Sequence, residues 1–389
     1  MMDSALPTFR IRNKTLLPIV QGGMGVGVSA HRLAGSVAAV GAVGTIASVD
    51  LRRLHPDLME ATGRSRDRDA IERANLQALD REIRAAQEIA KGNGVIAVNV
   101  MRAVTQYVDY VRQAGESGAG AVVMGAGLPL DLPDIASDFP DLCVIPILSD
   151  VRGVALVLKK WQRKNRLPDA IVIEHPRYAG GHLGAAKPED LADPRFDFEV
   201  VVPGVLQTFK DMGLESENIP VIVAGGVESH ERIRELLALG ASAVQLGTAF
   251  AVTQEGDAHP EFKRVLAQAK PEDIVTFMSV AGLPARAVRT PWLEKYLRRE
   301  EKLKLAASPD HRCTLAWDCL LSCGLRDGLA KAGQFCIDHQ LAAALRGDLE
   351  KGLFFRGAGR LPFGEQIRSV KELIDYLVTG VKPADMQAA

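Results

Sequence analysis

Short apolar runs alternate with amphipathic stretches from residue 18 to about residue 250. Each run is rich in valine and isoleucine and is apolar at consecutive positions, which is typical of parallel strands buried on both faces. The stretches between them place apolar residues along one side at helical spacing. The predicted strands span residues 18–20, 43–47, 95–98, 121–124, 144–148, 170–173, 221–224 and 243–246, and the predicted helices span residues 30–40, 73–91, 104–114, 151–164 and 228–239.

Strands that alternate with helices form parallel β-α units with right-handed crossovers, and eight such strands close a (β/α)8 barrel. The alternation ends by Trp292, and the rest of the chain carries helical charge patterns at residues 294–304, 341–353 and 369–377. We therefore predict an α/β fold with a (β/α)8 TIM barrel over residues 1–292. A smaller, mainly helical C-terminal region over residues 293–389 is expected to pack on it.

Composition narrows the classes of partner. The 389 residues carry a net charge of −1, which gives no global field to attract nucleic acid or an anionic membrane. The first residues lack the basic start and apolar core of a signal peptide, and no apolar run approaches the ~20 residues that span a bilayer. We expect a cytoplasmic protein that acts on a small molecule, without nucleic-acid or membrane partners; an oligomer is compatible with this composition.

Glycines follow the last two predicted strands, where barrels often hold a phosphate. The seventh strand is followed by Gly225 and Gly226, and the eighth leads into Gly247 and Thr248. Glycines allow backbone N–H groups to approach a phosphate closely, the helix that follows the seventh strand adds a favourable dipole, and the threonine hydroxyl can donate a hydrogen bond. Tight turns alone would also use these glycines, but two such motifs in consecutive units favour a phosphate site.

An alternative phosphate site lies near the N-terminus. Residues 25–30 fit the dinucleotide fingerprint G-x-G-x-x-A, with Asp50 after the next strand. The strand before them is very short, however, and a Rossmann domain would leave the later glycine motifs unexplained. We favour a glycine-rich loop after the first strand that lies against a flat cofactor ring.

The end of the sixth predicted strand carries a histidine in a glycine frame. Gly180 and Gly181 bring the backbone close to a ligand, while His182 projects from a mobile turn. An imidazole that titrates near neutrality suits proton transfer or charge stabilisation. A loop histidine is usually solvated and inert, but its position at the catalytic end of a strand favours a functional role.

In combination, these motifs resemble the nitronate monooxygenase (2-nitropropane dioxygenase) family, over roughly residues 15–292. The resemblance rests on residues 18–24, 99–101, 179–184, 224–226 and 245–248. It implies non-covalent FMN, with Gly22, Gly23 and Met24 beside the isoalloxazine and His182 as the catalytic histidine. The other FMN contacts that we expect, from the resemblance together with the glycine motifs, are Asn99, Gly180, Gly181, Gly225, Gly226, Gln245, Leu246, Gly247 and Thr248.

One departure from the family pattern affects the substrate more than the cofactor. Many members carry Gln-Gly-x-Glu directly before Ala-Gly-Gly-His, whereas this chain has residues 175–178 there. Glu174 or His175 is expected to replace the glutamine that contacts flavin. The leading interpretation is oxidation of alkyl nitronates by O2 to a carbonyl compound and nitrite. The alternative, shared with enoyl-ACP reductase II and certain NADH:quinone reductases, is NAD(P)H-dependent reduction of FMN with a quinone or enoyl thioester as acceptor. A third interpretation, a non-catalytic flavin-binding regulator, leaves His182 without a role.

Four of the five cysteines lie in the C-terminal region with the spacing C-x5-C-x3-C-x12-C. Four thiols so close in sequence could ligate zinc or an iron–sulfur cluster. The spacing matches no standard site, so reduced, buried cysteines without a metal are the favoured interpretation. Cys143, the fifth, is expected in the core. The other four are Cys313, Cys319, Cys323 and Cys336.

Overall fold

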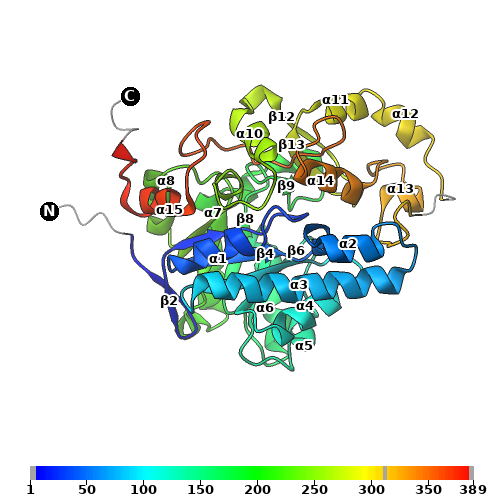
Figure 1. The fold of residues 1–389 in the computed structure, drawn as a ribbon. Coiled ribbons are helices and arrows are strands. Elements are labelled where there is room, and N and C mark those ends of the chain that lie inside the picture. Colours follow the sequence, from blue (N-terminus) through cyan, green and yellow to red (C-terminus); the bar gives the residue numbers. More distant parts are fainter. Residues whose placement is uncertain (1–5, 310–312, 385–389) are drawn as a thin grey trace.

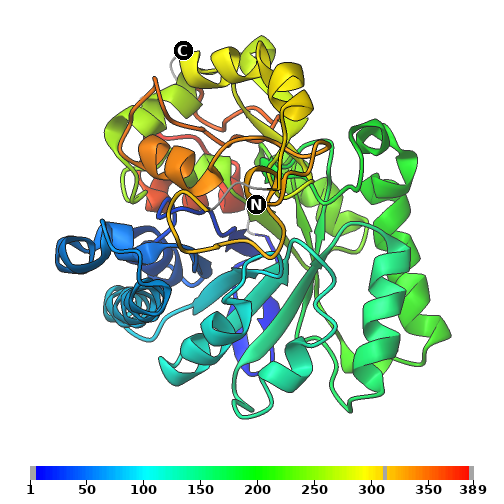
Figure 2. The ribbon, with the colours of Figure 1, turned by 90° about the vertical axis from the view of Figure 1, so that its right-hand side faces the viewer.

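Eight parallel strands close into a barrel in this computed structural model, which describes residues 6–309 and 313–384. The closed ring confirms the predicted (β/α)8 fold and excludes the open Rossmann sheet (Figures 1 and 2). The strand order is β10-β11-β3-β4-β5-β6-β7-β8. The bounds are β3 Ile19–Gln21, β4 Val43–Ala47, β5 Val95–Met101, β6 Ala121–Gly125, β7 Cys143–Leu148, β8 Ile171–Glu174, β10 Val221–Ala224 and β11 Ala243–Leu246.

Alternate residues of the barrel strands face two different cores, because successive side chains of a strand point to opposite faces. In β5, Val95 and Ala97 belong to one cluster, whereas Ile96 and Val98 belong to a larger cluster shared with the helices. An N-terminal hairpin of β1 (Phe9–Ile11) and β2 (Lys14–Leu16), which the apolar pattern did not reveal, adds buried side chains to the first cluster.

Helices surround the strands. Those predicted from the periodic pattern are present as α1 (His31–Ala39), α3 (Arg68–Ala90), α4 (Tyr107–Glu116), α6 (Val151–Gln162) and α8 (His230–Ala238). None of the described helices is long and apolar enough to cross a membrane. Helices that the pattern did not predict are α2 (Pro56–Thr62), α5 (Leu132–Ile135) and α7 (Phe198–Asp211), and short 3₁₀ turns lie at η1 Leu51–Leu54, η2 Pro188–Ala192, η3 Pro194–Phe196, η4 Glu215–Glu217 and η5 Pro271–Asp273.

A long excursion follows β11 and gathers on one side of the molecule (Figures 1 and 2). It includes a sheet that was not predicted, in which β13 (Pro284–Val288) pairs antiparallel with both β12 (Ile274–Met278) and β9 (Gly181–His182). The rest of the described excursion consists of short helices joined by irregular chain, and the helix predicted over residues 341–353 ends at Leu345. Its helices are α9 (Thr248–Ala251), α10 (Pro260–Gln268), α11 (Pro291–Leu297), α12 (Glu300–Leu305), α13 (Gly324–Asp327) and α14 (Ile337–Leu345).

The last helix, α15 (Val370–Thr379), returns to the barrel and packs against α1 and α8. It occupies the place of an eighth barrel helix, next to the helices that follow the first and seventh barrel strands. Leu293 and Leu377 belong to the same hydrophobic cluster as the outward-facing residues of the barrel strands. One hydrophobic core thus continues across residue 292. The division into two domains at that residue therefore stays a prediction.

Candidate active site

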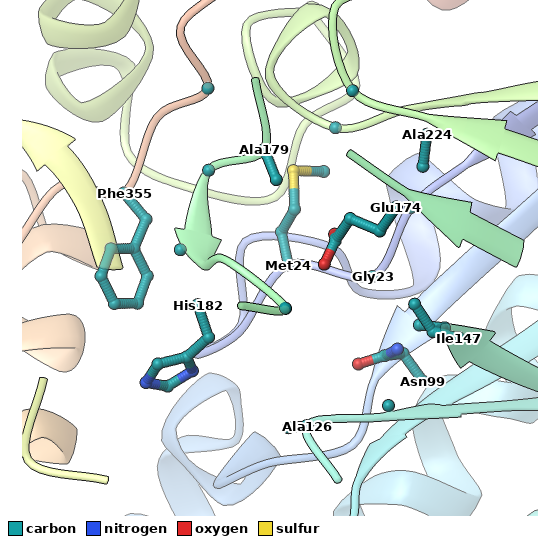
Figure 3. A pocket seen from close by; sticks show the side chains of 18 of the residues that line it. Gly23, Met24, Asn99, Ala126, Ile147, Glu174, Ala179, His182, Ala224 and Phe355 are labelled. Atoms are coloured by element: carbon teal, nitrogen blue, oxygen red, sulfur yellow. The ribbon is translucent and has the colours of Figure 1, made fainter. Parts of the chain in front are cut away.

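One large cavity, of about 650 Å³, opens at the carboxyl ends of the barrel strands. Glu174, Asn99 and His182 reach into this space from different segments of the chain (Figure 3). All but one of the residues expected at the site line the cavity. They are Gly22, Gly23, Met24, Asn99, Glu174, Gly180, Gly181, His182, Gly225, Gly226, Gln245, Leu246, Gly247 and Thr248.

The loop after β3 lies against two amide side chains. A Cβ on Gly23 would come within 2.3 Å of the Asn99 Cβ, and a Cβ on Gly22 would lie 3.2 Å from the Gln245 Nε2. At Gly23 only glycine fits this close to Asn99, whereas at Gly22 the end of the Gln245 side chain could shift to make room. The result is a wall of glycine backbone with amide groups beside it, and such groups can pair with the polar edge of a flat ring.

The glycine loop after β10 requires a backbone that other residues rarely adopt. Gly225 and Gly226 have φ values of +99° and +70°, in the left-handed region that favours glycine. A Cβ on Gly226 would also lie 3.0 Å from the Tyr178 ring. The backbone conformation and the packing of Tyr178 thus demand this glycine, in addition to any role in binding a phosphate.

A segment far along the chain, residues 355–361, completes this end of the cavity. The Gly357 N–H donates to the Thr248 Oγ1 at 3.0 Å, which leaves the threonine proton free to donate to a ligand. The Arg356 guanidinium donates to the backbone carbonyls of Leu266 and Gly359 and so fixes the segment. We did not predict this segment as part of the site. Its only signal in the sequence is a pair of glycines between arginines.

Gly180 allows the loop after β8 to pack closely against residues 356–357. A Cβ there would lie 2.5 Å from the Gly357 nitrogen and 2.6 Å from the Arg356 carbonyl carbon. The glycine is thus required where the loop after β8 meets residues 356–357, even though it also lines the cavity.

His182 is held in a strand rather than in a mobile turn. It pairs with Ala285 of β13, and its Nε2 lies 3.0 Å from the Ser279 Oγ. Desolvation lowers the pKa of His182 to about 4, so the imidazole is neutral at pH 7. The expectation that it titrates near neutrality is wrong, because its surroundings provide no carboxylate to stabilise the imidazolium.

Glu174, at the end of β8, is the group that titrates near neutrality. Desolvation alone raises the pKa of its carboxyl to about 7, because no cation lies near enough to offset the burial. Such a group exchanges a proton readily at physiological pH. From the sequence we expected Glu174 only as a flavin contact, since nothing local signals the desolvation.

His175 does not line the cavity, and we withdraw it from the cofactor set. Its side chain is 2% exposed, and its Nε2 lies 3.2 Å from the Asp197 Oδ1. The ring packs edge-on against Tyr178 and Phe198, with centroids 4.7 and 5.1 Å apart. Adjacent residues at a strand end point to opposite sides, so Glu174 enters the cavity and His175 turns away from it.

Comparison with known proteins agrees with this geometry. A family model described as nitronate monooxygenase matches residues 10–380. The chain belongs to the nitronate monooxygenase family. A probable nitronate monooxygenase of Bacillus subtilis (strain 168) is 28% identical over 289 residues, which cover 72% of this chain and 78% of that protein. A nitronate monooxygenase of Pseudomonas aeruginosa is 32% identical over 120 residues, 31% of each protein.

Two solved structures share the fold. FabK from Thermotoga maritima has a TM-score of 0.62 and 24% identity, with 93% of this chain and 91% of that chain covered. A nitroalkane oxidase from Streptomyces ansochromogenes has a TM-score of 0.61 and 19% identity, with 95% and 96% covered. At these identities the two structures establish the barrel alone, and family membership identifies a flavin-dependent oxidoreductase.

The cavity of this family member fits a flavin. Its amide groups, at Asn99 and Gln245, stand beside the glycine wall after β3, where a ring can lie flat. The positive-φ glycine loop after β10 and the Thr248 hydroxyl stand at the ends of neighbouring strands, as a phosphate requires. These two groups of residues suit the two ends of one mononucleotide.

Proposed function

We propose that this member of the nitronate monooxygenase family binds FMN and oxidises alkyl nitronates with O2 to a carbonyl compound and nitrite. The observation that carries the proposal is the neutral His182 in a cavity that also offers a glycine wall beside Asn99 and Gln245 and a positive-φ glycine loop near Thr248. FMN bound there would supply the redox chemistry by accepting electrons from the substrate and passing them to oxygen.

His182 would bind the nitro group. When the Ser279 hydroxyl donates to the Nε2, the imidazole proton sits on the Nδ1 and can be donated to a nitro oxygen. A neutral imidazole does this without a proton transfer, which matches a substrate that arrives already as an anion. The three-stranded sheet of β9, β12 and β13 keeps the ring in place.

Glu174 would act on the neutral form of the substrate. A nitroalkane must lose a proton from carbon before it becomes a nitronate, and a carboxylate with a pKa of about 7 is a suitable base. This assignment replaces His182 as the base, because an imidazole with a pKa of about 4 is a weak one.

Apolar side chains would receive the alkyl part of the substrate. Val104, Leu283 and Phe355 line the cavity, with the Phe355 ring centroid 5.9 Å from that of His182. Such walls exclude water, which strengthens hydrogen bonds to the nitro group.

Anaerobic stopped-flow mixing tests the proposal. Flavin released from the purified protein should be FMN by mass spectrometry, and a nitronate should bleach the bound flavin faster than NADH or NADPH. Admitting O2 should then restore the colour and release nitrite. Bleaching by NADH or NADPH but not by a nitronate would support the reductase alternative, and released FAD would contradict the cofactor assignment.

A further inference from the structure

Four of the five cysteines line one small cavity, separate from the large one. They come from a stretch of 24 residues that has only one short helix before α14, and all four are free thiols. In the sequence their spacing favoured unrelated buried cysteines, whereas the fold brings them around a common space. They are Cys313, Cys319, Cys323 and Cys336.

All four thiols border the same small cavity, whose other lining residues include the apolar side chains of Leu320, Leu325 and Ile337. A single cationic side chain, Arg326, lines the same cavity, together with Asp318, whose carboxylate lies 3.5 Å from it. Four thiolates gathered with one arginine would suit a group that carries positive metal charge.

Hydrogen bonds rather than regular elements hold this stretch in place. The Thr105 N–H donates to the Cys319 carbonyl at 3.1 Å, and the Cys323 N–H donates to the Asp327 Oδ2 at 2.8 Å. Arg326 donates to the Leu320 carbonyl at 2.9 Å. The loop is thus folded back on itself around the thiols, and the first bond ties it to the connection after β5.

We propose that Cys313, Cys319, Cys323 and Cys336 hold a four-iron iron–sulfur cluster. Such a cluster takes four cysteine thiolates, one on each iron, so its ligands surround a body rather than a point. A structural zinc ion instead needs four ligands at about 2.3 Å from one centre. Among the described residues no three histidine, cysteine or acidic side chains converge closely enough for a single ion, although four thiols share one cavity. Each cysteine would lose its proton on binding iron.

The proposed cluster would lie against the candidate active site. Cys319, Leu320 and Ile337 line both the small cavity and the large one. The same stretch also supports the catalytic histidine's partner, because the Gly333 N–H donates to the Ser279 carbonyl at 2.9 Å. The proposed cluster would therefore lie next to the flavin site. The presence of the cluster does not depend on which substrate the flavin site oxidises.

Metal and sulfide analysis of protein purified without oxygen, with its flavin bound, tests the proposal. The protein is first reconstituted anaerobically with ferrous iron and sulfide and then desalted. We expect about four irons and four acid-labile sulfides per chain, and a low-temperature EPR signal after dithionite reduction that differs from the narrow line of a flavin radical. Cys323→Ser and Cys336→Ser should lose both the signal and most of the iron.

Cys143→Ser is the matched control, because Cys143 lies in β7 among the barrel core residues and away from the small cavity. It should keep full iron and sulfide. Flavin content reports folding in each variant, and the wild-type stoichiometry decides the question even if a variant fails to fold. Reconstituted wild-type protein with zinc but no sulfide, or with no metal, would overturn the proposal, as would Cys323→Ser protein that keeps all of its iron.

Discussion

Burial moves the pKa values of two cavity residues in opposite directions. The pKa of the Glu174 carboxyl is raised to about 7, and the pKa of the His182 imidazole is lowered to about 4. In both cases the cause is desolvation, which penalises the charged form. At neutral pH the histidine is therefore an uncharged hydrogen-bonding group. The glutamate is present in comparable amounts as the protonated acid and the carboxylate. Groups separated in this way can take different roles in one reaction.

The first prediction concerns Glu174. Oxidation of a neutral nitroalkane should rise as the pH increases through about 7, because the carboxylate form acts as the base. Glu174→Gln should abolish this rise and slow nitroalkane turnover by about 10²–10⁴. Oxidation of a preformed nitronate should stay near the wild-type rate. Oxygen consumption measured against pH with both substrate forms checks this; an equal loss with the nitronate would show that Glu174 is not a base.

The second prediction concerns His182. His182→Ala should retain FMN but lose about 10²–10³ in the rate of flavin bleaching, the loss typical of removing one hydrogen-bond donor to a developing charge. The loss should be similar for nitroalkane and nitronate, because both need the hydrogen bond to the nitro group. Single-turnover rates for both forms test this. His339→Ala removes an exposed histidine outside the cavity and should behave as wild type. Wild-type bleaching in His182→Ala would make His182 a bystander.

At the scale of secondary-structure elements, the large cavity is lined by the loops at the carboxyl ends of the barrel strands and by one distant segment, residues 355–361. The loops after β3, β10 and β11 supply glycines at neighbouring strands, as the barrel order requires. Residues 355–361 then lie across them, through the Gly357 bond to Thr248 and the close approach to Gly180. The end of the cavity at which we propose that the phosphate binds is therefore closed by chain that lies more than a hundred residues beyond the strands.

The third prediction tests this junction. Thr248→Val removes the hydroxyl that accepts from Gly357 and that is free to donate to a phosphate. Hydrogen bonds to charged groups contribute about 1.5–3 kcal/mol, so the FMN dissociation constant should rise by about ten- to a hundredfold. Thr248→Ser should restore tight binding. Thr253→Val removes a buried hydroxyl outside the cavity and should leave FMN affinity unchanged in fluorescence titrations. Unchanged affinity in Thr248→Val would mean that the phosphate lies elsewhere.

At the scale of the whole molecule, the chain leaves the barrel after β11 and returns to it in α15. The excursion covers the carboxyl ends of the strands and supplies Phe355, Ser279 and the cysteine stretch to one side of the cavity. The returning helix packs on α1 and α8, which belong to the first and seventh β-α units. The barrel and its cover thus share one hydrophobic core.

The fourth prediction follows from α15. Leu377 is fully buried in the core shared with the barrel, so Leu377→Ala should lower the free energy of unfolding by about 2–5 kcal/mol. Leu305→Ala, at a side chain that is 89% exposed, should change it by less than about 0.5 kcal/mol. Urea unfolding of both variants, followed by circular dichroism, measures the difference. A small effect at Leu377 would show that α15 is dispensable for the barrel.

The sequence by itself determined the barrel and most of the residues that line its large cavity. Buried parallel strands need consecutive apolar residues, and a backbone that approaches a ligand needs glycine, so both features leave marks within a few residues. Gly22, Gly226 and Thr248 were placed at the cavity in this way, and their contacts with a cofactor stay a prediction. The resemblance to a known family then indicated the class of enzyme, because these motifs and their order can be read directly from the sequence.

Tertiary structure alone decided the rest. The desolvation of Glu174 and His182, the outward turn of His175 and the pairing of β9 with β13 depend on chain that is distant in sequence. The four cysteines illustrate the same limit, because their spacing gave no sign that the folded loop places all four beside one cavity. Burial and convergence are properties of the packed chain, so residue spacing carries no record of them.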